Sequence, residues 1–317
     1  MKIFVNKVIE ILVLILFPFT LISTLWLKVA SRYKLKVNAF IYNLLGVLPI
    51  KDHYYQPMIN AKKHLRYSLR DERFLPGINF NDHEQLNILN NFNFNNELIE
   101  FPLEKGAEEE YYYNCKAFCS GDSEYLYNMI RYFQPKNLYE IGSGFSTLMA
   151  RNAIEKNKEV LDDYSCNHVC IEPYEMPWLN KLDIEIMKDK VETIDHSFFK
   201  SLKKNDILFI DSSHIIRPQG DVLFELLEIL PILNSGVIIH IHDIFSPYDY
   251  LDDWVHNHYL WNEQYILEAF LSCNDSFRII GATNFLSHKY KNEFSAKCPI
   301  YKSQTGREPG SFWIQKN

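Results

Sequence analysis

Two apolar runs in the second half of the chain, residues 206–210 and 236–241, each end in acidic and histidine residues. The four side chains that follow these runs are Asp211, His214, His242 and Asp243. Each run has the length and composition of a strand buried in a parallel sheet. Residues 221–232 predict a connecting helix, so the two strands should be parallel neighbours. We therefore expect the four side chains to meet at the carboxyl edge of a sheet, where open α/β sheets bind ligands.

These residue types suit the removal of a proton from a substrate. A histidine titrates near neutral pH, so His242 or His214 is placed to act as a general base. Asp211 could orient that histidine or bind a metal ion. Strand alternation puts His240 on the same face as His242 but deeper, and we expect it to be a hydrogen-bonded core histidine.

A glycine turn upstream predicts where a ligand binds. Residues 138–141 predict a short buried strand, Gly142 and Gly144 allow a tight turn, and Ser146 and Thr147 open a helix. Such a turn points free backbone N–H groups and a helix N-terminus at the space above the strand. This arrangement suits a nucleotide-like ligand.

Two acids near that turn refine the prediction. Glu140 lies in the first strand, where its carboxylate should repel phosphate and attract a cation, so we expect the ligand to carry positive charge there. Glu172 ends a second predicted strand, residues 168–171, and an acid in that place can bind both ribose hydroxyls of an adenosine ligand. A third strand is predicted at residues 184–187.

The turn and the later strands together resemble a known family. Motif I of the class I S-adenosylmethionine (SAM) methyltransferases, written E/D-x-G-x-G, resembles residues 140–144, which read E-I-G-S-G. A bacterial branch with many glycan- and antibiotic-associated proteins, macrocin-type O-methyltransferases among them, is similar in two stretches, D-I-L-F-I-D-S-S-H and G-V-I-I-H-I-H-D-I-F. The alternative, a nicotinamide-dependent Rossmann oxidoreductase, is disfavoured because Thr147 replaces the third glycine of G-x-G-x-x-G and because Glu140 is negative.

The resemblance implies an α/β fold with a Rossmann-like, seven-stranded, mostly parallel sheet and helices on both faces. Residues 277–282 and 310–314 would form its antiparallel edge. It also implies SAM as cofactor, with Glu192 in the loop where the family's adenine contact falls. The cofactor-binding residues carried over are Glu140, Gly142, Ser143, Gly144, Ser146, Thr147, Glu172, Glu192 and Asp211.

Metal-dependent relatives bind magnesium with the acid that ends the fourth strand and an acidic pair that ends the fifth. Those positions here are Asp211, His242 and Asp243. The histidine departs from the family pattern, because Mg²⁺ prefers oxygen ligands. The sequence therefore leaves open another divalent ion or none.

The predicted reaction is methylation of a hydroxyl on a sugar or glycan-linked small molecule, with His242, His214 and Asp211 as the catalytic residues. The alternative is a non-catalytic, membrane-tethered methyltransferase-like partner in glycan assembly. Retention of Glu140, both glycines and Glu172 argues against that alternative.

Composition limits the class of partner. The chain has 317 residues, 47% of them hydrophobic, and a net charge of −7. This content allows a full core, and the negative charge excludes the electrostatic footprint of a nucleic-acid-binding protein, so a small-molecule or glycan acceptor fits better. Four of the 6 cysteines form two C-x3-C pairs, which lack the C-x2-C spacing of zinc ribbons, and we expect free thiols.

The N-terminus is almost unbroken apolar sequence from Ile11 to Leu27. Extended to residues 8–29 it nears the length of a membrane-spanning helix, roughly 20 residues. The alternative is that this run forms a buried helix of an N-terminal domain. Basic residues on the C-terminal side of this run outnumber those before it, which places the catalytic region in the cytoplasm by the positive-inside rule. The basic residues compared are Lys28, Arg32, Lys34 and Lys36 against Lys2 and Lys7.

These patterns divide the chain into three parts. Residues 1–50 are expected to be a membrane-associated helical anchor, residues 51–120 a cap or linker, and residues 121–317 the methyltransferase domain. Three successive tyrosines at residues 111–113 could line a pocket, although ordinary packing aromatics explain them better.

Overall fold

The computed structural model describes residues 2–30, 35–174 and 177–317. They form two compact units, one of residues 1–66 with 256–260 and one of residues 67–255 with 261–317. The second unit therefore takes in most of the segment expected to be a cap or linker.

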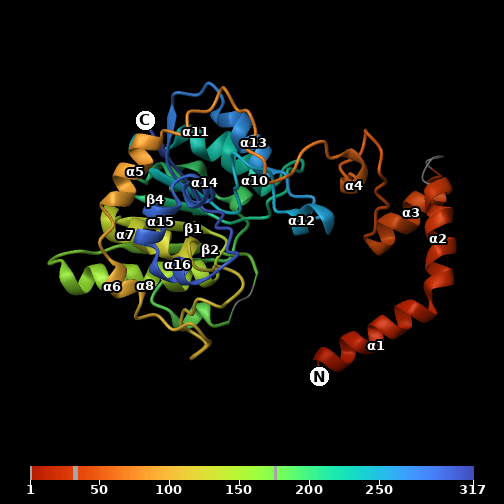
Figure 1. Ribbon diagram of the computed structural model, residues 1–317, viewed down its shortest axis with the longest axis horizontal. Coiled ribbons are helices and arrows are strands. Elements are labelled where there is room, and N and C mark those ends of the chain that lie inside the picture. The colour runs from red at the N-terminus through yellow and green to blue at the C-terminus, as the bar shows by residue number, and fades with distance from the viewer. Residues whose placement is uncertain (1, 31–34, 175–176) are drawn as a thin grey trace. The chain divides into compact units, whose positions relative to one another are not determined.

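One 7-stranded sheet forms the centre of the second unit, in the order β3-β2-β1-β4-β5-β7-β6 (Figure 1). The strands are β1 (Asn137–Ile141), β2 (Asn167–Ile171), β3 (Glu185–Met187), β4 (Ile207–Ile210), β5 (Ile238–Ile241), β6 (Phe277–Ala282) and β7 (Phe312–Lys316). The first five strands pair in parallel, and β7 is antiparallel to both β5 and β6. The predicted Rossmann-like sheet with its antiparallel edge is confirmed.

Helices cover both faces of this sheet, with α7 and α8 on one side and α10, α11 and α13 on the other (Figure 1). The α-helices after residue 67 are α5 (Asp82–Asn90), α6 (Asn95–Leu98), α7 (Asp122–Phe133), α8 (Phe145–Val160), α9 (His196–Lys200), α10 (Asp221–Phe224), α11 (Leu230–Ile232), α12 (Asp252–His256), α13 (Glu263–Leu271), α14 (Thr283–Lys289), α15 (Lys291–Lys297) and α16 (Pro299–Ser303). A π-helical turn, Glu225–Ile229, joins α10 to α11, so the helix predicted at 221–232 is continuous.

The central strands are apolar because helices cover both of their faces. Every residue of β4 and β5 is buried, as expected for strands in the middle of a parallel sheet. His240 lies in this core and stacks on Phe209 at 4.0 Å between ring centroids. The expected hydrogen bond is wrong, because neither ring nitrogen of His240 has a partner among the described residues. Burial lowers its pKa well below the ordinary value, so the ring is neutral.

Two of the three tyrosines before α7 are packing residues, and the third, Tyr112, is half-buried. Tyr111 and Tyr113 are buried, and their hydroxyls donate to the carbonyl oxygens of Phe118 and Leu98 at 2.8 Å each. This pairing satisfies the phenol groups inside the core, and it confirms the plainer of the two sequence readings.

The first unit contains α1 (Lys2–Ile15), α2 (Phe17–Ala30), α3 (Lys36–Leu45) and α4 (Ala61–His64). Among the described residues no single helix is long and apolar enough to cross a membrane, but residues 6–15 and 17–30 pass that test together as a pair bent by 68°. The membrane-spanning helix expected over residues 8–29 is therefore not confirmed as one helix, and the anchor stays a prediction. Pro18 explains the bend, because proline cannot donate the helical hydrogen bond and its ring clashes with the preceding turn.

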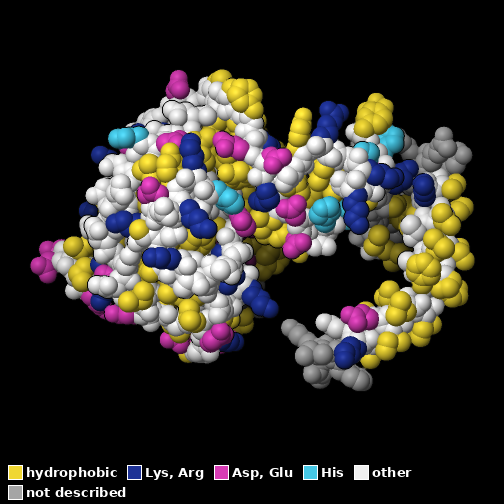
Figure 2. All heavy atoms as spheres, viewed as in Figure 1, with side chains coloured by type: hydrophobic (Ala, Val, Ile, Leu, Met, Phe, Trp, Pro, Cys, Tyr) yellow, Lys and Arg dark blue, Asp and Glu magenta, His cyan; other side chains and the backbone are white. Residues whose placement is uncertain are grey.

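Hydrophobic side chains gather along α1 and α2 (Figure 2). Arg32 and Lys34, on which part of the orientation argument depends, lie outside the described residues.

Candidate functional site

The glycine turn ties three strand ends together. The Gly142 N–H donates to the Ile171 carbonyl at 3.1 Å, and the Asp211 N–H donates to the Ile141 carbonyl at 2.9 Å. Gly142 has φ +80°, and a Cβ there would lie 2.0 Å from the Asp211 carbonyl oxygen. Only glycine lets β1 and β4 approach this closely at the point where the strand order of the sheet reverses.

Glu140 fixes the turn from inside. Its carboxylate is buried and accepts hydrogen bonds from the Ser146 hydroxyl at 2.6 Å, the Thr147 hydroxyl at 2.8 Å and the His168 Nε2 at 3.1 Å. The expectation that this charge faces the ligand is wrong, because three internal donors already surround it. The hydroxyls of Ser146 and Thr147 likewise face Glu140, so these residues act on a ligand only through the helix start that they hold.

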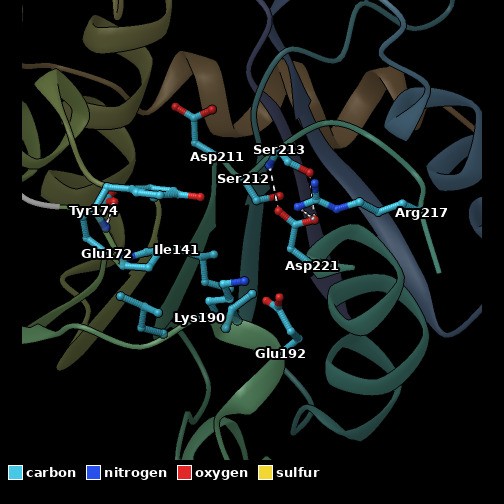
Figure 3. A pocket seen from close by; sticks show the side chains of 14 residues that line it. Ile141, Glu172, Tyr174, Lys190, Glu192, Asp211, Ser212, Ser213, Arg217 and Asp221 are labelled. Carbon is cyan, nitrogen blue, oxygen red and sulfur yellow. Dashed lines mark hydrogen bonds and ion pairs between the residues drawn. The ribbon is translucent and has the colours of Figure 1, made fainter. Parts of the chain in front are cut away.

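A cavity of about 260 Å³ opens above the glycine turn (Figure 3). Its lining is Ile141, Gly142, Ile171, Glu172, Pro173, Tyr174, Lys190, Val191, Glu192, Asp211, Ser212, Ser213, Arg217 and Asp221. Four of the predicted cofactor residues lie there, namely Gly142, Glu172, Glu192 and Asp211. Glu192 and Lys190 lie at the opposite end of the view from Asp211 (Figure 3). The remaining predicted residues do not line the cavity: they lie at the end of β1 (Glu140), in the turn (Ser143 and Gly144) and at the start of α8 (Ser146 and Thr147).

Backbone donors orient the acid at the end of β2. The N–H groups of Ser143 and Tyr174 donate to the two carboxylate oxygens of Glu172 at 3.1 and 2.9 Å. Each oxygen keeps further acceptor capacity. Glu172 can therefore accept hydrogen bonds from two adjacent hydroxyl groups of a ligand in the cavity.

In the loop after β4 and the helix that follows it, the sequence analysis singled out Asp211 and His214 but not Ser213, Arg217 or Asp221. The Asp221 carboxylate accepts from the Ser213 N–H at 3.0 Å and from its hydroxyl at 2.8 Å, and Arg217 approaches the same carboxylate at 3.9 Å (Figure 3). The available signal was the position of Asp221 at the first residue of a predicted helix, since acids there often hold the preceding loop.

The structure brings the four predicted acids and histidines together at the ends of β4 and β5. The His214 Nε2 lies 3.3 Å from Asp211 Oδ1 and 3.6 Å from Asp243 Oδ2, and its Nδ1 lies 2.9 Å from Glu263 Oε2. His214 and Asp243 both have positive φ, 59° and 57°. Such strained backbone in non-glycine residues often marks a functional site.

Charge sets the protonation of this cluster. Burial works to lower the pKa of His214, but the carboxylates of Asp211 and Glu263 outweigh it and the pKa lies well above the ordinary value. Burial also works against the charged form of His242, yet Asp243 and Asp211 raise its pKa. Burial raises the pKa of Asp243 to about 6. Burial works to raise the pKa of Asp211 as well, but His242 and His214 outweigh it and lower that pKa. His214, His242 and Asp243 therefore hold protons more tightly than free side chains do, and Asp211 less tightly.

His242 occupies a different place from His214. Its Nε2 lies 3.6 Å from Asp243 Oδ1, and its Nδ1 has no hydrogen-bond partner within the described residues. It lines a second cavity of about 490 Å³. That cavity is lined by Arg70, Lys116, Ala117, Cys119, Ser120, Asp122, His242, Asp243, Phe245, Leu251, Asp252, Asp253, Trp254, Gly306, Arg307, Glu308 and Pro309.

A divalent ion fits the cluster with one change to the predicted ligands. Side-chain atoms of Asp211, His214 and Asp243 lie within 4.8 Å of one another. His214 stands where the sequence suggested His242, because its positive φ turns the ring between the two carboxylates. Two oxygens and one nitrogen suit several divalent ions, and such an ion would replace the proton on His214.

Comparisons with known proteins agree with this arrangement. A family model described as a methyltransferase domain matches residues 139–244, which run from β1 through the glycine turn to the end of β5. An uncharacterised protein of Archaeoglobus fulgidus is 30% identical over 167 residues, which cover 49% of this chain and 74% of that protein.

Proposed function

Because this chain belongs to the methyltransferase domain family, we propose that it binds SAM in the first cavity and methylates a hydroxyl of an acceptor in the second. The observation that carries the proposal is the position of the acid–histidine cluster between the two cavities. Asp211 lines the first cavity, whereas His242 and Asp243 line the second. The His214 ring lies between Asp211 and Asp243.

The first cavity has the groups that SAM needs. Glu172 is oriented to accept hydrogen bonds from the ribose hydroxyls, and Val191 and Glu192 lie where the adenine would bind. The N–H groups of Gly142, Ser143 and Gly144 donate within the protein, so the start of α8 is the source of backbone N–H groups for the carboxylate of SAM. Asp211 supplies negative charge for the sulfonium, which donates the methyl group when SAM is bound.

His242 is the proposed general base. It lines the acceptor cavity, its Nδ1 is buried and unpaired among the described residues, and Asp243 lies beside its Nε2. The neutral ring would take the proton of the acceptor hydroxyl as the new C–O bond forms. Because its pKa is raised above 6.5, activity should fall as the pH drops through that raised value.

The alternative role for the cluster is to hold a divalent ion on Asp211, His214 and Asp243. The ion would polarise the acceptor oxygen and lower the pKa of its hydroxyl. Activity that EDTA abolishes and one divalent ion restores would favour this role. EDTA-resistant activity that rises with pH would favour His242 as the base.

A variant of His242 tests the catalytic assignment. With a radiolabelled methyl group on SAM, His242→Ala should lower transfer by roughly two or more orders of magnitude, while SAM binding stays nearly unchanged. His196→Ala is the control, because His196 is an exposed histidine paired with Glu228. Full activity in His242→Ala would contradict the general-base role, whereas the metal role depends on Asp211, His214 and Asp243 and is tested by the EDTA experiment.

A sugar or glycan-linked small molecule is the proposed acceptor, in line with the macrocin-type resemblance. The second cavity supports this in size, since ligand pockets run from roughly 300 to 1,000 Å³, and in its mixed lining of charged groups with Phe245 and Trp254. The net negative charge of the protein disfavours a nucleic-acid partner.

We further propose that residues 1–50 attach the protein to a membrane and that the catalytic unit works in the cytoplasm, where SAM is made. Support comes from the bent apolar pair α1 and α2 and from their exposed hydrophobic side chains. Subcellular fractionation of the full-length protein tests this proposal.

A further inference from the structure

The Arg307 guanidinium, in the lining of the second cavity, is held by neutral groups alone. Its Nε donates to Gln304 Oε1 at 3.0 Å, its Nη1 to Cys119 Sγ at 3.3 Å and its Nη2 to Asn114 Oδ1 at 3.4 Å. Over residues 2–30, 35–174 and 177–317, no carboxylate forms an ion pair with Arg307. A partly buried positive charge is therefore left without a carboxylate partner among the described residues.

The partners of Arg307 also hold one another. The Ser120 hydroxyl donates to Gln304 Oε1 at 2.6 Å, and Gln304 Nε2 donates to Asn114 Oδ1 at 3.1 Å. The guanidinium is consequently fixed in orientation before any ligand binds. Arginine has five N–H donors in a rigid plane, and three are engaged here, which leaves one on each of the two terminal nitrogens.

A second cation lies in the same cavity lining. Lys116 is exposed, and within the described part of the chain its ammonium group forms no hydrogen bond or ion pair. Its φ of 68° is in the left-handed region, which is uncommon for a lysine. It belongs to the same loop as Cys119 and Ser120, the neighbours of Arg307.

Most of the acidic side chains that line this cavity have partners other than Arg307 and Lys116. Asp122 accepts from the backbone N–H groups of Gly310 and Ser311 at 3.1 and 2.7 Å. Asp252 approaches Arg70 at 3.5 Å.

Glu308 pairs with His288 at 2.8 Å and accepts from Asn284 at 2.9 Å. Asp243 belongs to the cluster with His214, and Asp253 is exposed to solvent on α12. None of these carboxylates forms an ion pair with Arg307 or Lys116 within the described ranges.

We propose that Arg307 and Lys116 form a binding subsite for an oxyanion group, phosphate or carboxylate, on the methyl acceptor. The acceptor would then be a hydroxylated organic anion rather than a neutral sugar, with its anionic group at Arg307 and its hydroxyl at His242. A rigid guanidinium with a free N–H on both terminal nitrogens matches the paired oxygens of either anion. The assignment to an acceptor rests on the proposed function, whereas the anion subsite itself can be tested alone.

Calorimetric titration of the full-length protein with inorganic phosphate, and separately with acetate, tests the subsite. Arg307→Gln should weaken binding of the preferred anion by about tenfold or more, the effect of losing a charge-assisted hydrogen bond. Arg278→Gln is the matched control, because Arg278 also donates to neutral amides, including Asn317 at 2.8 Å, but does not line this cavity. The stronger binder of the two anions identifies the chemical class.

Three results would overturn the subsite: no binding of either anion, equal binding by the wild type and Arg307→Gln, or an equal loss in Arg278→Gln, which marks adventitious ion binding. If Arg307→Gln fails to fold, Lys116→Gln is the deciding variant, because the Lys116 ammonium group has no hydrogen bond to lose among the described residues. Lys116→Gln should still weaken binding of the anion. A SAM titration on the same samples separates the two proposals. Failure of SAM to bind would overturn the proposed function and leave the anion result standing.

Discussion

The two glycines of the turn differ in what a side chain would meet. A Cβ on Gly142 would lie 2.0 Å from the Asp211 carbonyl oxygen, whereas a Cβ on Gly144 meets no atom within 4 Å. Gly144 also has extended backbone, φ −177°, which any residue adopts. The first glycine is required by the protein itself, and the second leaves open space in which a ligand can approach the backbone.

We therefore expect opposite results from two matched substitutions. Gly142→Ala should destabilise the fold by about 1–3 kcal/mol or more, because it adds a clash and an unfavourable positive φ. Gly144→Ala should leave the melting temperature unchanged and weaken SAM binding. Thermal unfolding with and without SAM measures both effects. Equal melting temperatures for the two variants would contradict the steric account.

The E-x-G-x-G motif predicted the site of the turn correctly but not the direction of its acid. Which way Glu140 points depends on His168, Ser146 and Thr147, whose donors surround it. The spacing of Ser146 and Thr147 in the first helical turn was visible in the sequence. Their engagement with the strand behind them depends on the packing of α8 against β1, which periodicity alone does not reveal.

At the scale of elements, β4 and β5 deliver the cluster and α13 orients it. The chain order of strand, helix and strand made Asp211, His242 and Asp243 predictable as neighbours. Glu263 was missed, because it comes from a helix 49 residues beyond His214 and no local pattern links the two. The Glu263 carboxylate contacts the Nδ1 of His214 and so holds the Nε2 toward the carboxylates of Asp211 and Asp243.

Glu263→Gln should lower the pKa of His214, because it removes a carboxylate that stabilises the protonated ring. In the wild type that raised pKa means that protonated His214 stabilises the fold below 6.5, and the contribution is lost as the pH rises through the raised value. The stability difference between wild type and Glu263→Gln should therefore shrink as the pH rises.

Histidine titration by NMR, together with denaturant unfolding across pH, checks this prediction. Glu228→Gln serves as the control, since Glu228 pairs with the exposed His196 and not with the cluster. A stability difference that grows at alkaline pH would contradict the assigned pairing of Glu263 with His214.

At the scale of the whole molecule, the chain separates into an apolar N-terminal unit and a catalytic unit that begins at Tyr67. The apolar length of the first segment was predictable by counting. Its bend was not predicted, although Pro18 gave the signal. The start of the catalytic unit was also hidden, because residues 67–120 pack onto the sheet through long-range contacts such as that of Asn81 Nδ2 with the Ile279 carbonyl at 3.2 Å.

Deleting residues 1–50 should release the protein from membranes and leave SAM binding intact, because the turn, Glu172 and the cluster all lie in the second unit. The measurement is the partition between membrane and soluble fractions for the full-length and shortened chains, followed by SAM titration of the shortened one. Full-length protein found wholly in the soluble fraction would end the membrane proposal.

The most direct test of the central claim is isothermal titration of the full-length protein with SAM and with NAD under the same conditions. The two cavities, the oriented Glu172 and the glycine turn predict that SAM binds with a dissociation constant on the order of micromolar, about −8 kcal/mol, and that NAD gives no binding heat. Glu172→Ala should weaken SAM binding. Glu185→Ala should not, because Glu185 is an exposed acid on β3. Binding of NAD in preference to SAM, or no binding of SAM at all, would contradict the account.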